Sequence, residues 1–231
     1  MKRIISIVIA SLMAFNAFSQ SSEDALVLAS SKNETVKFEA FEHIGYGYSF
    51  TKSKDFDPST GWEFFVNVLD LGIYPAENFG IDMGVDLLFN VFNQKNAVFF
   101  LDSDRNIRSV AAPVYFADIA DIKKVRSDFS TFSFNVPLLF KAIFNDFSIG
   151  VGVEGSWNVT GGTDYNYRSN NHRTRVSENK AKVNPFSYGF LATIALNDGG
   201  IYFRYHPKSS HLLPQDGLDL SYMTLGIAFN F

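Results

Sequence analysis

Residues Leu220–Phe231 alternate between two kinds of side chain. Every second residue counted back from Phe231 is apolar: Phe229, Ile227, Leu225 and Met223. The residues between them are small or polar: Asn230, Ala228, Gly226 and Thr224. A repeat of two predicts a β-strand whose two faces meet different surroundings. Because this strand ends on an aromatic residue, we expect it to close a barrel in a bilayer, where closure pairs its backbone edge and lipid covers its apolar face.

The N-terminus has the pattern of a secretory signal peptide. Lys2 and Arg3 precede a mostly apolar run, Ile4–Phe18, and Ala17 and Ser19 supply small residues for cleavage before Gln20. Residues 1–19 are therefore predicted to be removed, and the polar, serine-rich residues 20–35 to form a short periplasmic lead-in. An uncleaved anchor is the alternative, but the run is short for a membrane-spanning helix.

Composition narrows the class of protein. The chain has 231 residues, enough for one all-β domain, and its 25 phenylalanines suit strands and membrane interfaces. The absence of cysteine excludes disulfides, thiolate metal sites, a cysteine nucleophile and a lipoprotein anchor. Without Lys2 and Arg3, the chain has 18 basic and 24 acidic residues. Nucleic acid is therefore not an expected partner.

Period-two segments predict eight strands in the rest of the chain. They are residues 36–50, 62–73, 79–92, 132–144, 147–159, 183–196, 201–205 and 220–231. Tight turns at 75–78, 145–146 and 197–200 alternate with longer loops at 51–60, 93–127, 160–182 and 206–217. Short periplasmic turns and longer extracellular loops are typical of outer-membrane barrels. Residues 36–231 are thus predicted to form an all-β, eight-stranded antiparallel up-and-down transmembrane β-barrel; ten strands would need two spans within 93–127, where Ala97–Leu101 is too short.

One face of each predicted strand is bulky and apolar, and the other is small or polar. A narrow barrel has no room for the bulky faces inside, so we expect them to face lipid. A soluble lipocalin-like ligand-binding barrel, with an apolar lumen, is the alternative. The predicted lumen then holds a polar network of Glu39, Glu63, Asp82, Asp86, Lys141, Glu154 and Arg204. We expect these charges to pair with one another, an ion or proton path being the other interpretation.

Three segments resemble a known family. They are Phe134–Lys141 (FNVPLLFK), Ile149–Val153 (IGVGV) and Leu225–Phe231 (LGIAFNF). With these strands placed, residues 36–231 resemble the small outer-membrane β-barrels of Gram-negative bacteria, most closely PorT-like barrels, in a group that includes OmpX-like proteins. The resemblance implies a non-enzymatic structural or interaction role in the cell envelope, including an accessory role in protein secretion. It also implies contact with outer-membrane lipid and recognition of the closing strand, through Phe231, by the barrel-assembly machinery.

No catalytic, cofactor or metal site is predicted. Gly150, Gly152 and Gly155 match a dinucleotide-binding pattern, but a strand and not a helix follows them, so we interpret them as strand packing. None of the four histidines has the spacing of a metal ligand. The alternative to a non-enzymatic role is an outer-leaflet lipid A-modifying enzyme that uses His211 and the preceding Ser209-Ser210.

The loop 160–182 is rich in basic residues. They are Arg168, Arg173, Arg175, Lys180 and Lys182. Because arginine binds phosphate well, these residues predict contact with lipopolysaccharide. An ordinary solvated loop is the alternative.

Overall fold

The computed structural model describes residues 36–40, 43–52, 60–119, 122–170, 172–196, 199–210, 212–214 and 220–230. The predicted signal peptide and lead-in, the segment 215–219, His211 and Phe231 lie outside this part of the chain.

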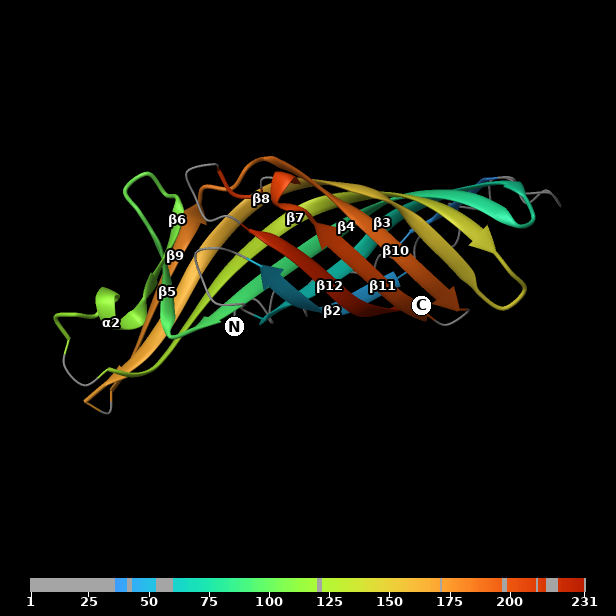
Figure 1. Cartoon of the computed structure of the whole chain (residues 1–231). Coiled ribbons are helices and arrows are strands. Elements are labelled where there is room, and N and C mark those ends of the chain that lie inside the picture. The colour runs from blue at the N-terminus through green and yellow to red at the C-terminus, as the bar shows by residue number, and fades with distance from the viewer. Residues whose placement is uncertain are drawn as a thin grey trace, which may run out of the picture. The chain divides into compact units, whose positions relative to one another are not determined.

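Eight of the described strands form a closed ring (Figure 1). In ring order they are β2 (His43–Lys52), β3 (Thr60–Ala76), β4 (Phe79–Lys95), β7 (Lys123–Ile143), β8 (Ser148–Ser169), β10 (Phe186–Leu196), β11 (Gly199–His206) and β12 (Ser221–Asn230). Each pairs antiparallel with the next, and β12 pairs with β2, from Ser221 opposite Lys52 to Asn230 opposite His43. The predicted eight-stranded antiparallel barrel is confirmed.

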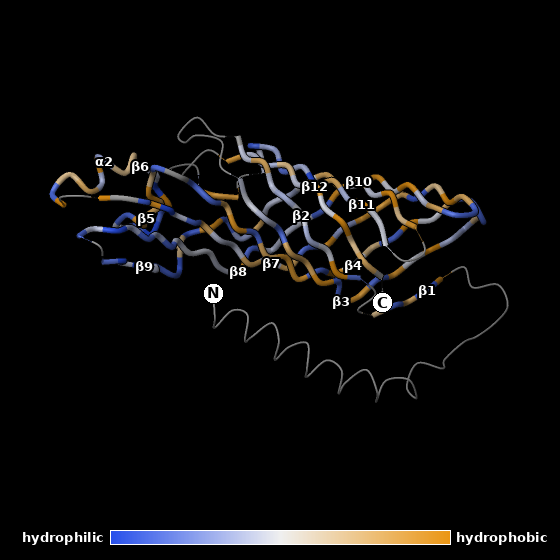
Figure 2. Tube along the Cα trace, turned by 90° about the horizontal axis from the view of Figure 1, so that it is seen from below, coloured by the Kyte–Doolittle hydropathy of each residue, from blue (hydrophilic) through white to orange (hydrophobic). Residues whose placement is uncertain are grey.

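Alternation along the strands separates an apolar exterior from a polar interior. Figure 2 shows hydrophobic and hydrophilic residues alternating along the strands. Large exposed side chains surround the ring on every strand. They include Tyr46, Tyr48, Phe50, Leu69, Met83, Phe140, Val151, Val153, Trp157, Phe186, Phe190, Phe203, Leu225 and Phe229. The inward residues of the same strands are largely polar and buried. This arrangement is opposite to that of a lipocalin-like barrel, whose apolar face lines the lumen.

Two of the register shifts in the barrel wall, one on β3 and one on β8, change which residues face inward. On β3 the register with β4 shifts between Asn67 and Leu69, so that Asn67 and Asp70 both lie on the inner face. Between β7 and β8 a shift occurs opposite Val159. Odd-numbered residues of β8 that precede this bulge, such as Trp157, are exposed. Odd-numbered residues that follow it, such as Tyr165, are buried. The outer face of β8 therefore continues above Val159 through its even-numbered residues.

Regular structure continues beyond the barrel at one end. A two-stranded hairpin, β5 (Ala97–Leu101) and β6 (Ile107–Ala111), is followed by the short helix α2 (Ala112–Tyr115). Strand β9 (His172–Ala181) pairs with the upper part of β8, and β7 also extends into this region. We call β5, β6, α2, β9 and the parts of β7 and β8 from 123–128 and 161–169 the crown. It lies at the end opposite the tight turns (Figure 1).

The crown corrects two predicted loops. Residues 93–127 and 160–182 contain β5, β6, β9 and the ends of β7 and β8. Their alternation was missed because no lipid contact makes one face uniformly apolar there. The small apolar cluster of Val98, Ala112, Phe116 and Tyr165 covers only one face of the crown sheet. The turn predicted at 75–78 is also shorter, since β3 continues to Ala76 and β4 begins at Phe79.

Two further short elements complete the described fold. Strand β1 (Val36–Glu39) pairs with β3 below the β2 pairing, and the 3-10 helix η1 (Lys208–Ser210) follows β11. Among the described residues, no helix combines the length and apolarity needed to cross a membrane.

Candidate functional site

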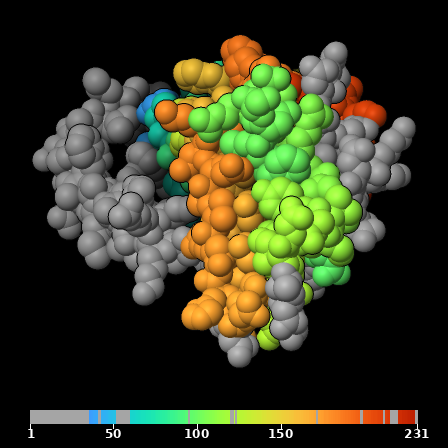
Figure 3. Space-filling model, turned by 90° about the vertical axis from the view of Figure 1, so that its left-hand side faces the viewer, coloured from blue at the N-terminus to red at the C-terminus, as the bar shows by residue number. Residues whose placement is uncertain are grey.

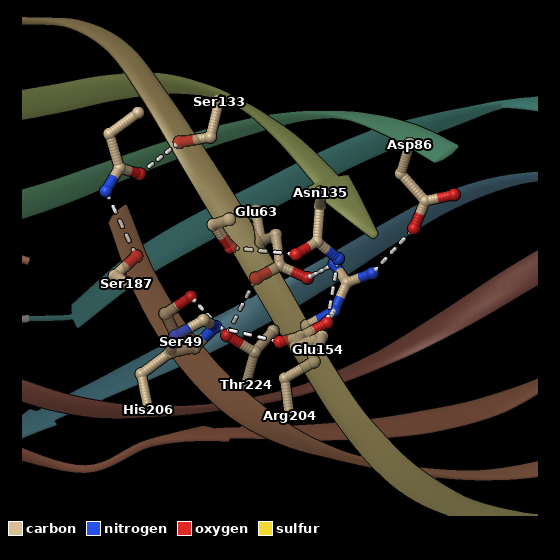
Figure 4. Close-up of polar contacts among 12 residues, drawn as sticks. Ser49, Glu63, Asp86, Ser133, Asn135, Glu154, Ser187, Arg204, His206 and Thr224 are labelled. Carbon is tan, nitrogen blue, oxygen red and sulfur yellow. Dashed lines mark hydrogen bonds and ion pairs between the residues drawn. The ribbon is translucent and has the colours of Figure 1, made fainter. Parts of the chain in front are cut away.

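The centre of the lumen is built around Arg204, an inward residue of β11 that is 1% exposed. Its Nε lies 2.9 Å from Glu154 Oε2, its Nη1 lies 2.6 Å from Glu63 Oε1, and its Nη2 lies 3.2 Å from Asp86 Oδ2. Figure 4 shows these carboxylates converging on the guanidinium. Because guanidinium presents donors in a rigid plane, one side chain binds carboxylates from β3, β4 and β8 together. We call these four residues the Arg204 cluster.

Neutral polar side chains add further hydrogen bonds to this cluster. Asn135 donates from Nδ2 to Glu154 Oε2 at 2.8 Å, and Asn67 donates from Nδ2 to Asp86 Oδ1 at 3.2 Å. Ser156 donates to Asn135 Oδ1 at 2.8 Å. Thr224 donates to Glu63 Oε2 at 3.3 Å. Buried charge is tolerated only when it is paired and hydrogen-bonded in this way.

His206 adds an imidazole to the lumen that was not predicted from the sequence. Its Nε2 lies 2.9 Å from Glu154 Oε1, and its ring stacks on Tyr222 with centroids 4.4 Å apart. The signal was present in the sequence, because residues two apart on a strand share a face and His206 follows Arg204 by two. The predicted strand 201–205 ended one residue too early to include it. Glu154 thus faces both Arg204 and His206.

Apolar layers flank the charges along β11. The guanidinium of Arg204 lies over the rings of Phe65 and Tyr202, with its Cζ 4.6 and 5.3 Å from their centroids. Phe65 and Tyr202 belong to one apolar cluster, whereas Tyr222, which stacks on His206, belongs to another. Since the order along β11 is Tyr202, Arg204 and His206, the charged layer lies between the two apolar clusters.

The remaining predicted lumen residues lie away from the Arg204 cluster. Asp82 and Lys141 form a separate ion pair, in which Asp82 is buried and Lys141 is partly exposed. The prediction that Glu39 belongs to the lumen network is wrong, because its side chain is exposed. It lies on β1, which pairs with β3 alone among the described strands, so no barrel wall encloses its side chain.

The five basic residues predicted to contact lipopolysaccharide are all exposed and lie in or beside the crown. Arg168 is on β8, whereas Arg173, Arg175 and Lys180 are on β9 and Lys182 follows it. Figure 3 shows the orange residues of β8 and β9 beside the green residues of β5, β6 and α2 at this end. Arg175 forms an ion pair with Asp164.

The other candidate motifs show no assembled site. Gly150, Gly152 and Gly155 all lie within β8, as predicted. Ser209 Oγ is hydrogen-bonded to the Tyr188 hydroxyl at 2.6 Å, while His211 lies outside the described residues. Within the described part of the chain, no three His, Asp or Glu side chains are grouped so that they could hold a metal ion.

A closed ring of eight antiparallel strands, apolar outside and charged inside, defines the fold as a transmembrane β-barrel. No protein-family model matches the chain, and no curated protein does. Among solved structures, the chain is similar to Ail, the attachment invasion locus protein of Yersinia pestis. The two are 15% identical over 84% of this chain and 100% of Ail, with a TM-score of 0.35. It is also similar to Neisserial surface protein A, with 9% identity over 86% of this chain and 100% of the other, and a TM-score of 0.39.

Proposed function

We propose that this protein is a non-enzymatic outer-membrane β-barrel that presents its crown outside the cell as an interaction surface. The observation that carries the proposal is the filled lumen. The Arg204 cluster and its flanking apolar clusters occupy the space through which an ion or solute would pass. A barrel of this size leaves room for side chains only, so the exposed ends carry the function.

The ordered crown supports an interaction role. Two backbone N–H groups of β5 donate to side chains of β7 and β9. Phe99 donates to Ser127 Oγ and Leu101 donates to Glu178 Oε2, both at 2.9 Å. Arg105 donates from Nη1 to the carbonyl oxygen of Asn179 at 3.1 Å. These bonds hold the β5–β6 hairpin against β7, β8 and β9. A surface fixed in this way binds a partner without the entropic cost of ordering a loop.

The first prediction concerns location and conductance. The full chain should fractionate with outer membranes and migrate faster on gels before heating than after it, because the closed barrel resists detergent until heated. In planar bilayers it should produce no steps of ionic current. A protein found only in the soluble periplasm would refute the membrane assignment. Steady single-channel current from a gel-shifted protein would refute the filled lumen, and with it the proposal that the exposed ends carry the function, but would leave the membrane assignment intact.

The specific partners are also part of the proposal. The resemblance to PorT-like barrels supports an accessory role in protein secretion, and the apolar alternation of the closing strand β12 supports recognition by the barrel-assembly machinery. Purification from outer membranes in mild detergent, followed by mass spectrometry, tests both. Stoichiometric envelope proteins would support a role in a larger machine. Recovery of the barrel with lipopolysaccharide alone would refute that role and leave the crown as the surface to study.

A further inference from the structure

The outward face of the crown sheet carries a concentration of arginine. Tyr165 and Tyr167 of β8 and Val176 of β9 lie on the inner face, packed in the cluster that includes Val98 of β5. Because side chains alternate along a strand, Arg168 and Arg173 point to the opposite face. Both are exposed.

The register places like charges directly opposite each other. Arg168 of β8 pairs with Arg173 of β9. In the next row, about 7 Å along the strands, Asn166 pairs with Arg175 on one side and with Arg126 of β7 on the other. Cross-strand pairs of like charge are destabilising, so the Arg168–Arg173 pair is unfavourable without an anion. Arg175 in the next row already pairs with Asp164. We call Arg126, Arg168, Arg173 and Arg175 the arginine face.

The position of the arginine face points to the kind of anion. Below it on the same outer surface, Asp128 pairs with Asp164, followed by Ser130 with Gly162 and Phe132 with Thr160. Val159 and Trp157, further down β8, belong to the exposed apolar belt. The arginine face therefore lies on the outside of the barrel above the belt, on the side of the lipid headgroups. A soluble partner would not require this continuity with the lipid-facing surface.

We propose that the arginine face binds the phosphate groups of an outer-leaflet glycolipid. The proposal rests on the proposed function, because it requires the crown to project from the outer leaflet. Arginine suits this ligand, since its planar fork donates two parallel hydrogen bonds to a phosphate. Of the five basic residues predicted from sequence, Arg168, Arg173 and Arg175 belong to this face. Arg126, which sequence analysis placed in a loop, joins them through the β7–β8 register.

The test uses the full chain in a zwitterionic detergent. Lipid A carrying phosphate groups is titrated into the wild type and into Arg168→Gln/Arg173→Gln, and bound lipid is counted by native mass spectrometry. The variant should bind about tenfold more weakly, because two charge-assisted contacts are lost. Its heat-dependent gel shift should persist, since the substitutions also remove a repulsive pair. The single variant Arg173→Gln should show a smaller loss in the same direction.

A matched control removes the same charge elsewhere in the crown. Arg108→Gln, the control for Arg173→Gln, removes one charge from the β5–β6 hairpin, where Arg108 pairs with Asp102, and should leave lipid A affinity within about twofold. An unchanged affinity in Arg168→Gln/Arg173→Gln would overturn the proposal. Equal binding of dephosphorylated lipid A would overturn the assignment of the phosphate groups as the ligand. Equally tight binding of inorganic pyrophosphate would overturn the assignment of a lipid as their source. Loss of the gel shift in wild-type protein would instead refute the proposed function.

Asp128 lies opposite Asp164 in the row next to Arg126, so a change in its charge should alter anion binding at the arginine face. Burial, and then the neighbouring Asp164, raise the pKa of Asp128 to about 6, although Arg175 and Arg126 act in the opposite direction. Its partner on β4 is Asn93, which does not titrate. As pH falls from 7.5 to 5, Asp128 takes up a proton and one negative charge disappears beside the arginine face. Anion binding should therefore strengthen over this range.

The variant Asp128→Asn isolates this effect. It lacks the negative charge at every pH, so it should bind phosphorylated lipid A about threefold more tightly than wild type at pH 7.5 and equally at pH 5. The lipid phosphates titrate in the same way with both proteins. Their effect therefore cancels in the ratio of the affinity of Asp128→Asn to that of the wild type at each pH. A ratio that stays constant between pH 5 and 7.5 would show that Asp128 does not regulate the site.

Discussion

Replacing Arg204 by methionine is expected to lower the free energy of unfolding of the barrel by at least about 3 kcal/mol. The substitution keeps a long side chain but leaves Glu63, Asp86 and Glu154 close together with His206 as the adjacent base. Breaking a buried ion network leaves charges that are neither solvated nor paired, which costs more than the network contributed. Urea unfolding of the chain in lipid vesicles, followed by tryptophan fluorescence and gel shift, measures the change.

A charge-neutral variant separates lost pairing from lost packing. Arg204→Met combined with Glu63→Gln, Asp86→Asn and Glu154→Gln removes the carboxylates as well, and should recover most of the lost stability. Lys141→Met is the milder comparison, because its partner Asp82 lies in a pair that solvent partly reaches. Equal stabilities for wild type and Arg204→Met would mean that the Arg204 cluster is not what holds the lumen together. Failure of the neutral variant to recover would assign the loss to packing.

The prediction from sequence succeeded where lipid and lumen impose opposite demands on one strand. Along β4, Met83 is exposed whereas Asp82 and Asp86 are buried, as the period of two requires. Glu63, Asp86, Glu154 and Arg204 could be placed on inner faces because each follows the local alternation. That three of them meet at one guanidinium could not be predicted, because it depends on the stagger between strands far apart in the chain.

Failures occurred where the alternation breaks or loses its contrast. The bulge at Val68 changes which residues of β3 face inward, and nothing in the local sequence marks it. In the crown, the outward face of the sheet is not uniformly apolar, and only a small apolar cluster covers the other face. The contrast between Arg168 or Tyr165 and its neighbours is therefore weaker than the contrast between lipid-facing and lumen-facing residues of the barrel. Arg126 was missed for the same reason. Glu39 was wrongly placed in the lumen because the apolar–polar alternation continues along β1, although the closed ring of strands does not extend to β1.

The barrel wall and the arginine face differ in how their charges are paired. The barrel wall is specified by a strong pattern and filled by charges that pair with one another. The arginine face has the opposite property at one pair, since Arg168 and Arg173 face each other across β8 and β9. A stabilising substitution is therefore available at Arg168 and Arg173 but not at Arg204. Selection for folding alone would favour neutral residues at the first two positions, which is the physical ground for assigning them a ligand.

Two glycines of β8 provide the sharpest test of the barrel wall. A Cβ at Gly152 would overlap the carbonyl oxygen of Leu138 on the neighbouring strand β7, and a backbone atom cannot move aside as a flexible side chain can. Gly152→Ala is therefore expected to lower the free energy of unfolding by at least about 2 kcal/mol. Gly155 is its matched control, because a Cβ there meets nothing within 4 Å.

Gly155→Ala should change the free energy of unfolding by no more than about 1 kcal/mol, in the stabilising direction, because it restricts the unfolded chain without a clash. Both substitutions alter the unfolded state equally, so the difference between them reports the folded wall alone. Urea unfolding in vesicles measures both variants in one series. Equal effects would mean that β7 and β8 do not approach at Leu138 as closely as the register requires. A clear difference would support the pairing of Leu139 with Gly152, the same register that places Asn135 opposite Ser156 and Arg126 opposite Asn166.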